Sequence, residues 1–145
     1  MVLSYLVGDR PEHVPAMTGL FHDSDGGKVQ FFGSTLLLVE VLRGGFGSPV
    51  DPELENRILR ILRDPATMTL VPVSVQVGML ARELSREHRL RTPDATHLAS
   101  AAFARVDSFM TLDEKDFPIG QVVRGVRIEL PASPSGTLVL PSPSE

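Results

Sequence analysis

The fold is decided by the stretch Thr92-Pro93-Asp94-Ala95-Thr96-His97-Leu98-Ala99-Ser100-Ala101. A threonine and a proline ahead of an acid are typical of the first turn of a helix. The alanine-rich continuation predicts a closely packed helix through Ala104. The next segment, Ser108-Phe109-Met110-Thr111-Leu112, predicts a strand that ends at Asp113. A helix that begins with an acid is therefore followed by a strand that ends with one.

Hydrophobic periodicity predicts the remaining elements on either side of this stretch. Further strands are expected over Met1–Val7, Val29–Phe32, Met68–Val73 and Val122–Leu130. Further helices are expected over Glu12–His22, over Leu36–Leu42 as a buried helix, after the cap Asp51, and from the cap Ser74 to Arg89. Strands that alternate with helices predict a three-layer α/β/α fold with a mainly parallel central sheet. Functional groups in such sheets gather at the carboxyl ends of the strands.

Length and composition indicate one domain, expected over residues 1–130, and a tail over residues 131–145 that is rich in proline and serine and expected to be disordered. The absence of cysteine excludes disulfides and thiolate catalysis, and it fits a reducing cytoplasm. The start lacks the pattern of a signal peptide, and no apolar run is long enough for a transmembrane helix. The formal net charge of −4 argues against nucleic-acid binding by a positive surface alone, but not against a nuclease.

Acidic residues stand at three structural transitions. Glu40 lies in an otherwise apolar helix, Asp94 at a helix start, and Asp113 at a strand end with Asp116 shortly after it. Each one taken alone is better explained as an exposed edge residue, a helix-capping acid or a loop acid. Together they form a plausible set of hard oxygen ligands for Mg²⁺ or Mn²⁺.

The same segments resemble the PIN-domain family, in particular ribonuclease toxins of the VapC type. Asp94 is followed by Ala-x-His-Leu-Ala, and Phe109 to Phe117 is similar to the family's closing motif, a strand followed by Thr-x-Asp-x-x-Asp-Phe. The helix with Glu40 is similar to the family's helix that carries its second acid. The resemblance covers roughly residues 1–130.

The resemblance implies roles for individual residues. Glu40, Asp94 and Asp113 are then metal-coordinating acids. Asp116 is an auxiliary acid that reaches the metal through water, and Thr111 orients a carboxylate or a metal-bound water. His97 is expected to be a packed or hydrogen-bonding support, not a ligand. The arginines Arg82, Arg86 and Arg89 fall close to one helix face and could touch phosphates, although a solvated face is the favoured interpretation.

The activity implied by the resemblance is that of a cytoplasmic Mg²⁺- or Mn²⁺-dependent endoribonuclease. Such a toxin hydrolyses RNA, is inhibited by a small antitoxin and commonly forms a homodimer. One feature departs from the family pattern, because Met1–Leu6 resembles the part that follows the family's first-strand Asp, and no acid precedes Asp9. A start several residues too late is the expected cause.

Two alternatives stay open at this point. The missing acid favours a degenerate PIN domain that binds RNA or protein without turnover, whereas the retained acids oppose it. A different Mg²⁺-dependent phosphate enzyme on a similar sheet is the third possibility. No glycine-rich phosphate loop in the sequence supports that one.

Overall fold

The computed structural model describes residues 29–40, 49–111 and 113–131. The predicted strand Met1–Val7, the predicted helix Glu12–His22 and the first-strand position therefore lie outside the described residues, as does the predicted tail beyond Pro131. In chain order, the described elements are β1 (Phe31–Ser34), α3 (Leu37–Glu40), α4 (Pro52–Arg63), β2 (Met68–Val71), α5 (Val75–His88), α6 (Thr92–Phe103), β3 (Ser108–Met110), β4 (Val122–Val123) and β5 (Val126–Glu129).

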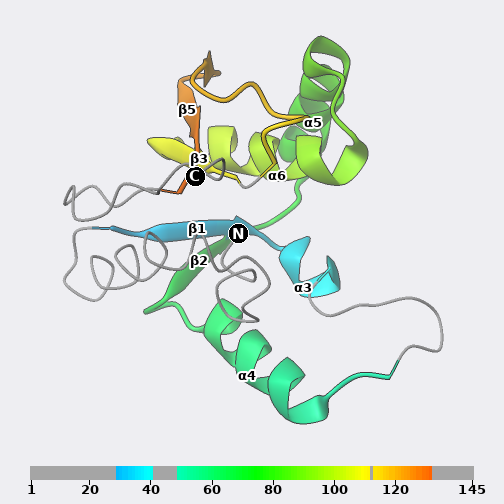
Figure 1. The fold of residues 1–145 in the computed structure, drawn as a ribbon, viewed down its shortest axis with the longest axis vertical. Helices are drawn as coiled ribbons and strands as arrows, with labels where there is room; N and C mark the ends of the chain where they lie inside the picture. The colour runs from blue at the N-terminus through cyan, green and yellow to red at the C-terminus, as the bar shows by residue number, and fades with distance from the viewer. Residues whose placement is uncertain (1–28, 41–48, 112, 132–145) are drawn as a thin grey trace, which may run out of the picture.

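The described elements form three layers, with strands between two groups of helices (Figure 1). Helices α5 and α6 pack against each other on one side, and α6 also contacts β1. Helix α4 lies on the opposite side and contacts β2. The predicted three-layer α/β/α class is confirmed.

The described strands are arranged in two sheets. In the first, β1 runs parallel to β2, with Phe31 opposite Met68. In the second, β5 pairs parallel to β3 and antiparallel to β4. The parallel pairing of β1 with β2 agrees with a connection through α3 and α4, because a crossover returns the chain in the same direction. The described chain from β3 to β5 contains β4 and no helix.

The single strand predicted over Val122–Leu130 is wrong, because the structure divides this segment into β4 and β5. Arg124 and Gly125 form the connection, with φ angles of 51° and 82°. Two successive positive φ values are the mark of the tight hairpin turn whose twist matches that of the flanking strands. A glycine suits the second of these positions because it has no Cβ to clash there.

The structure also corrects the prediction that Leu36–Leu42 forms a buried helix. Helix α3 contains no buried residue over Leu37–Glu40, and Val39 is 62% exposed. Leu37 alone of these four packs against a hydrophobic cluster, together with α4 and β1 residues. Although its composition is apolar, this helix lies at the margin of the described structure (Figure 1).

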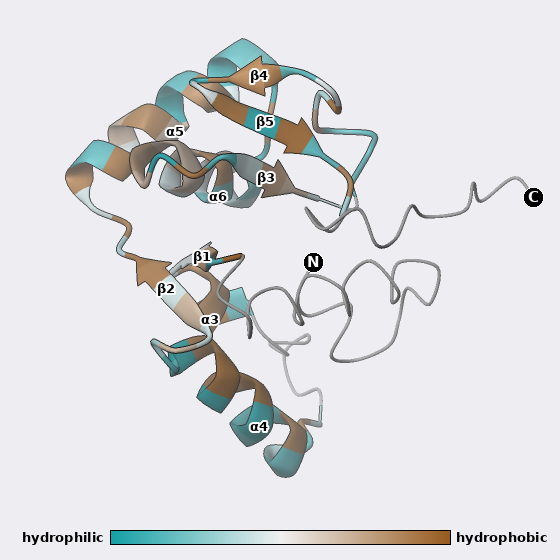
Figure 2. Ribbon diagram, turned by 90° about the vertical axis from the view of Figure 1, so that its left-hand side faces the viewer, coloured by the Kyte–Doolittle hydropathy of each residue, from teal (hydrophilic) through white to brown (hydrophobic). Residues whose placement is uncertain are grey.

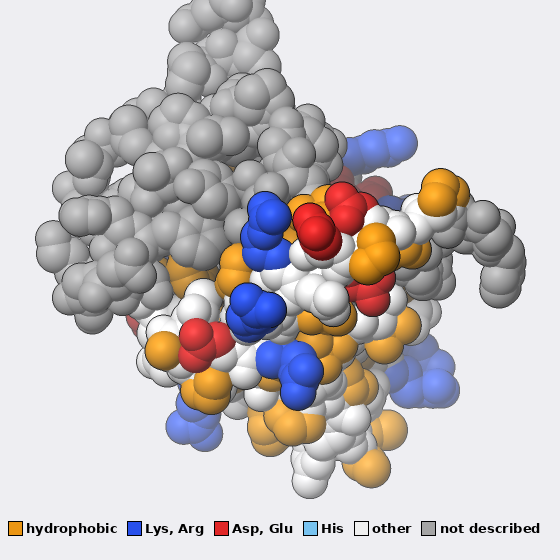
Figure 3. Space-filling model, turned by 90° about the horizontal axis from the view of Figure 1, so that it is seen from below, with side chains coloured by type: hydrophobic (Ala, Val, Ile, Leu, Met, Phe, Trp, Pro, Cys, Tyr) orange, Lys and Arg blue, Asp and Glu red, His pale blue; other side chains and the backbone are white. Residues whose placement is uncertain are grey.

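The cores on the two sides of the strands differ in how they are built. Helix α4 is amphipathic: Ile58 and Leu62 are buried against Phe31 and Met68, and the polar residues alternate with them along the helix (Figure 2). Its arginines Arg57, Arg60 and Arg63 are exposed. The face seen from below carries several basic and acidic side chains among apolar ones (Figure 3). The other core joins α5, α6 and β5 through Val77, Ala81, Leu84, Leu98, Ala99 and Ile128.

No helix within the described ranges is long and apolar enough to cross a membrane.

Helix α5 begins where the sequence predicts, at the cap Ser74. The Ser74 Oγ atom accepts a hydrogen bond of 3.2 Å from the backbone N–H of Val77. A Ser74→Ala variant is expected to lower the free energy of unfolding by about 1 kcal/mol, since a first-turn donor loses its partner. Denaturant unfolding measures this, with Ser74→Asp as a control that retains a capping oxygen. Equal stability of wild type and Ser74→Ala would show that the cap contributes nothing.

Candidate metal centre

Asp94 is placed by the first turn of α6, two residues after the helix begins at Thr92. Pro93 stands within this first turn, where the missing N–H of proline costs no helical hydrogen bond. The Asp94 side chain is only 22% exposed. Its Oδ2 atom is buried and has no hydrogen-bond partner among the described residues. A buried carboxylate oxygen without a donor is unfavourable unless a cation compensates it.

Asp113 is fixed by a network of hydrogen bonds just beyond β3. Its Oδ1 atom accepts from the backbone N–H groups of Lys115 and Asp116, each at 3.0 Å. Its own N–H donates to Thr111 Oγ1 at 3.0 Å. Thr111 is buried, and its N–H is bonded to the carbonyl of Glu129 in β5. The Asp113 carboxylate is therefore held in a turn whose base is tied to the second sheet.

Asp116 stands at the end of this turn, directly before a buried anchor. Phe117 is 6% exposed, and its ring centroid lies 5.1 Å from that of Phe109 in β3. Burying an aromatic side chain of this size against a neighbouring ring stabilises the turn by hydrophobic burial and ring contact. The turn is thus held at both ends, by Thr111 and by Phe117.

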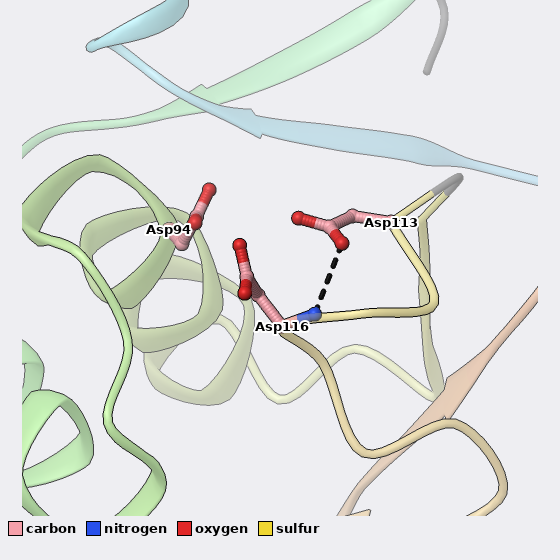
Figure 4. A group of neighbouring side chains, drawn as sticks. All are labelled: Asp94, Asp113 and Asp116. Atoms are coloured by element: carbon pink, nitrogen blue, oxygen red, sulfur yellow. Dashed lines mark hydrogen bonds between the residues drawn. The ribbon is translucent and has the colours of Figure 1, made fainter.

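The two motifs meet in space. Asp94, Asp113 and Asp116 each offer a carboxylate oxygen, and these oxygens all lie within 4.8 Å of one another. In Figure 4, Asp94 projects from α6, while Asp113 and Asp116 project toward it from the turn after β3. Asp94 lies on a different element from Asp113 and Asp116 and is far from them in the sequence. The fold therefore brings the three acids together.

The electrostatics of the cluster separate Asp94 from Asp113. Burial raises the pKa of Asp94, Arg91 opposes this shift, and the neighbouring carboxylates of Asp113 and Asp116 add to it. The backbone N–H of Asp116 is the largest cause that lowers the pKa of Asp113, although partial burial works in the other direction. Hydrogen-bond donors thus favour the ionised form of Asp113, whereas burial and the neighbouring carboxylates disfavour the ionised form of Asp94.

Glu40 is placed differently from the other acids that the sequence singles out. It lies at the described end of α3, and its carboxylate contacts Nε2 of His97 in α6 rather than joining the three aspartates. His97 thus acts on a carboxylate as a hydrogen-bonding group. Glu40, His97, Asp94 and Thr111 nevertheless line one cleft of about 1040 Å³, which also runs along β1 and β3. Glu40 therefore faces the same cleft as Asp94, the member of the cluster that lines it.

Arg91 is a site residue that sequence reasoning missed. It is the residue before α6, and its guanidinium lies 3.7 Å from a carboxylate oxygen of Asp94 and 3.7 Å from one of Asp116. The spacing of three residues to Asp94 was a usable signal, because side chains so spaced meet on a helix. The contact with Asp116 depends on the fold and has no signature in the sequence. The arginines Arg82, Arg86 and Arg89 are exposed.

Comparison with known proteins agrees with this geometry. A model of the PIN domain family matches residues 1–119. No curated protein and no solved structure matches the chain. The family match spans most of the chain and includes the elements that carry Asp94, Asp113 and Asp116, so the chain belongs to the PIN domain family, whose members are generally metal-dependent nucleases.

Proposed function

We propose that this PIN domain is an endoribonuclease of the VapC toxin type that needs Mg²⁺ or Mn²⁺. The observation that carries the proposal is the convergence of Asp94, Asp113 and Asp116 within 4.8 Å. Three carboxylates so close repel one another unless a cation is shared between them. The resemblance of the two motifs to VapC-type toxins supports the choice of RNA as the substrate.

The donor set fits a hard divalent cation. All three side chains offer carboxylate oxygens, which Mg²⁺ and Mn²⁺ prefer over nitrogen and sulfur donors. The Oδ2 atom of Asp94 supplies a second indication, because it is buried without a hydrogen-bond donor among the described residues, and the Arg91 guanidinium lies 3.7 Å from it. Asp94, Asp113 and Asp116 are therefore the residues that we assign to the ion, and we assign Glu40 to the outer edge of the same site.

When bound, a divalent ion supplies Lewis acidity toward a phosphodiester and makes a coordinated water more acidic. The chain's own residues supply the framework. Thr111 holds the backbone of Asp113, and the N–H groups of Lys115 and Asp116 keep the Asp113 carboxylate ionised. His97 restrains Glu40 at the cleft. These contacts fix the acids before substrate arrives, which lowers the cost of organising them during the reaction.

The partners belong to the same proposal. A small antitoxin that covers the cleft, a homodimer and a cytoplasmic location all follow from the resemblance to VapC-type toxins, and the absence of cysteine fits that location. We assign residues 1–130 to the nuclease domain and residues 131–145 to a tail.

A second candidate is a PIN domain that binds RNA without cleaving it. The placement of Glu40 favours it, because this acid contacts His97 and stands outside the group of three aspartates. Fewer negative ligands lower the affinity of a site for a divalent ion. The two candidates differ in one observable, which is metal-dependent turnover.

Metal removal tests the proposed function. Purified protein incubated with a mixed single-stranded RNA is expected to cleave it with Mn²⁺ or Mg²⁺, to stop when EDTA is added, and to resume when excess metal is restored. Cleavage is measured by gel electrophoresis of end-labelled RNA. Cleavage that continues in EDTA would contradict a metal-dependent reaction. RNA binding in a gel-shift assay without cleavage under any metal would favour the binding module.

A further inference from the structure

Arg91 occupies an unusual position relative to the acidic cluster. Its backbone is extended, with φ −68° and ψ 157°, at the residue that caps α6, and its side chain makes no capping hydrogen bond. That side chain is 78% exposed, yet its Nε atom lies 3.7 Å from Asp94 Oδ2 and its Nη2 atom lies 3.7 Å from Asp116 Oδ2. One guanidinium therefore spans two of the three carboxylates.

The contacts of Arg91 are ionic rather than hydrogen-bonded. Both distances exceed those of charge-assisted N–H···O bonds, which are about 2.7–2.9 Å, and Asp94 Oδ2 has no hydrogen-bond partner among the described residues. A guanidinium that is largely in water and not bidentate is held weakly. Arg91 thus neutralises the acids without being locked onto them, which is the behaviour of a counter-ion that can be displaced.

We propose that Arg91 is the counter-cation of the metal-free cluster and competes with the divalent ion for Asp94 and Asp116. The inference rests on the proposed metal centre and deepens it. A positive charge close to these carboxylates repels a second cation that approaches the same oxygens. Arg91 thereby sets how much metal is needed to fill the site, and it also limits the repulsion among the acids when metal is scarce.

The charge balance of the cluster supports this role. Arg91 lowers the pKa of Asp94 and of Asp113, against the effect of burial on both. Two side chains lower the pKa of Asp94, Arg91 and His97, and Arg91 is the larger influence. His97 is already in contact with Glu40. Among the described residues, Arg91 is therefore the main positive charge facing the three aspartates.

Metal affinity in the absence of RNA tests the inference. Isothermal titration with Mn²⁺ at low ionic strength would compare wild type with Arg91→Gln, Arg91→Lys and Arg60→Gln. Arg60 is an exposed arginine of α4, on the opposite side of the strands from α6, so its substitution controls for net charge. We expect Arg91→Gln to bind Mn²⁺ about three- to tenfold more tightly, because one repulsive charge is removed near the site. Arg91→Lys and Arg60→Gln are expected to bind like wild type.

Salt dependence separates this electrostatic role from a structural one. In about 1 M salt the screening length falls to about 3 Å, so the difference between wild type and Arg91→Gln should shrink. Clear Mn²⁺ binding with equal affinity in wild type and Arg91→Gln would overturn the role of Arg91 and leave the metal centre standing. Weaker binding by Arg91→Gln would also overturn it. Binding by Arg91→Gln alone would support it, and no binding by either protein would overturn both the role and the metal centre.

Discussion

An Asp94→Asn variant is expected to lose RNA cleavage by about a hundredfold or more, since loss of several kcal/mol of transition-state stabilisation corresponds to such factors. The substitution keeps the size of the side chain and removes its charge. Asp94 is the member of the cluster that α6 contributes, so no neighbour on the turn after β3 replaces it. Initial rates of cleavage of one labelled RNA at saturating Mn²⁺ measure the loss.

The same variant is expected to be more heat-stable than wild type when metal is absent. Burial raises the pKa of Asp94, and the repulsion from Asp113 and Asp116 adds to this. A carboxyl whose pKa is raised by folding favours the folded state below its unfolded pKa, and that contribution is lost as pH rises through the folded pKa. At neutral pH the ionised Asp94 therefore destabilises the metal-free protein. Its removal should raise Tm, by about 2–4 °C for each kcal/mol recovered.

Asp94→Asn is thus expected to lower the rate of cleavage but to raise Tm, and this combination makes the prediction specific. Glu114→Gln is the matched control, because Glu114 follows Asp113 in the same turn, is exposed and is not part of the group of three aspartates. It should keep cleavage close to that of wild type and leave Tm nearly unchanged. Cleavage by Asp94→Asn at the wild-type rate, or a lower Tm of this variant without metal, would contradict the assignment of Asp94.

Leu98→Ala is expected to cost about 2–5 kcal/mol of stability, the range for truncating a fully buried leucine. Leu98 is 0% exposed, and it belongs to the core cluster that joins α5, α6 and β5. Since it lies one turn beyond Asp94 on α6, the cavity left by the substitution would loosen the helix that positions the carboxylate. Tm should fall by on the order of 10 °C.

Thermal and denaturant unfolding measure the effect of Leu98→Ala. Met79→Ala serves as its control, because Met79 is 57% exposed on α5 and its truncation should change stability by less than about 0.5 kcal/mol. Similar stabilities of the two variants would show that the cluster around Leu98 is not the core that the structure indicates.

Much of the helical structure is predictable because its signals are local. Asp51 followed by proline, Ser74 and the pair Thr92-Pro93 mark the starts of α4, α5 and α6 within a residue or two. The hairpin of β4 and β5 escapes prediction because its turn is Arg124-Gly125, which lacks the Asn-Gly or Asp-Gly pair that commonly signals such turns. The exposure of α3 is likewise not local, since composition does not say what packs against a helix.

The candidate site likewise has features that the sequence predicts and features that depend on the fold. The sequence predicts Glu40, Asp94 and Asp113 as the metal-coordinating acids, with Asp116 in an auxiliary position, because these acids stand at fixed places in motifs that resemble the family's. The turn that orients Asp113 is formed by its immediate neighbours. The structure places Asp116 with the other two acids, where the sequence predicted an auxiliary position. The contact of Glu40 with His97 joins residues far apart in the chain and depends on how α3 meets α6. That contact could not be derived from spacing.

The most direct test of the metal centre is the anomalous scattering of Mn²⁺ in crystals of the protein grown with the ion. We expect a single strong peak between Asp94, Asp113 and Asp116, at about 2 Å from their coordinating carboxylate oxygens. A bound Mn²⁺ located only away from these three residues, or three vacant carboxylates at millimolar Mn²⁺, would contradict it.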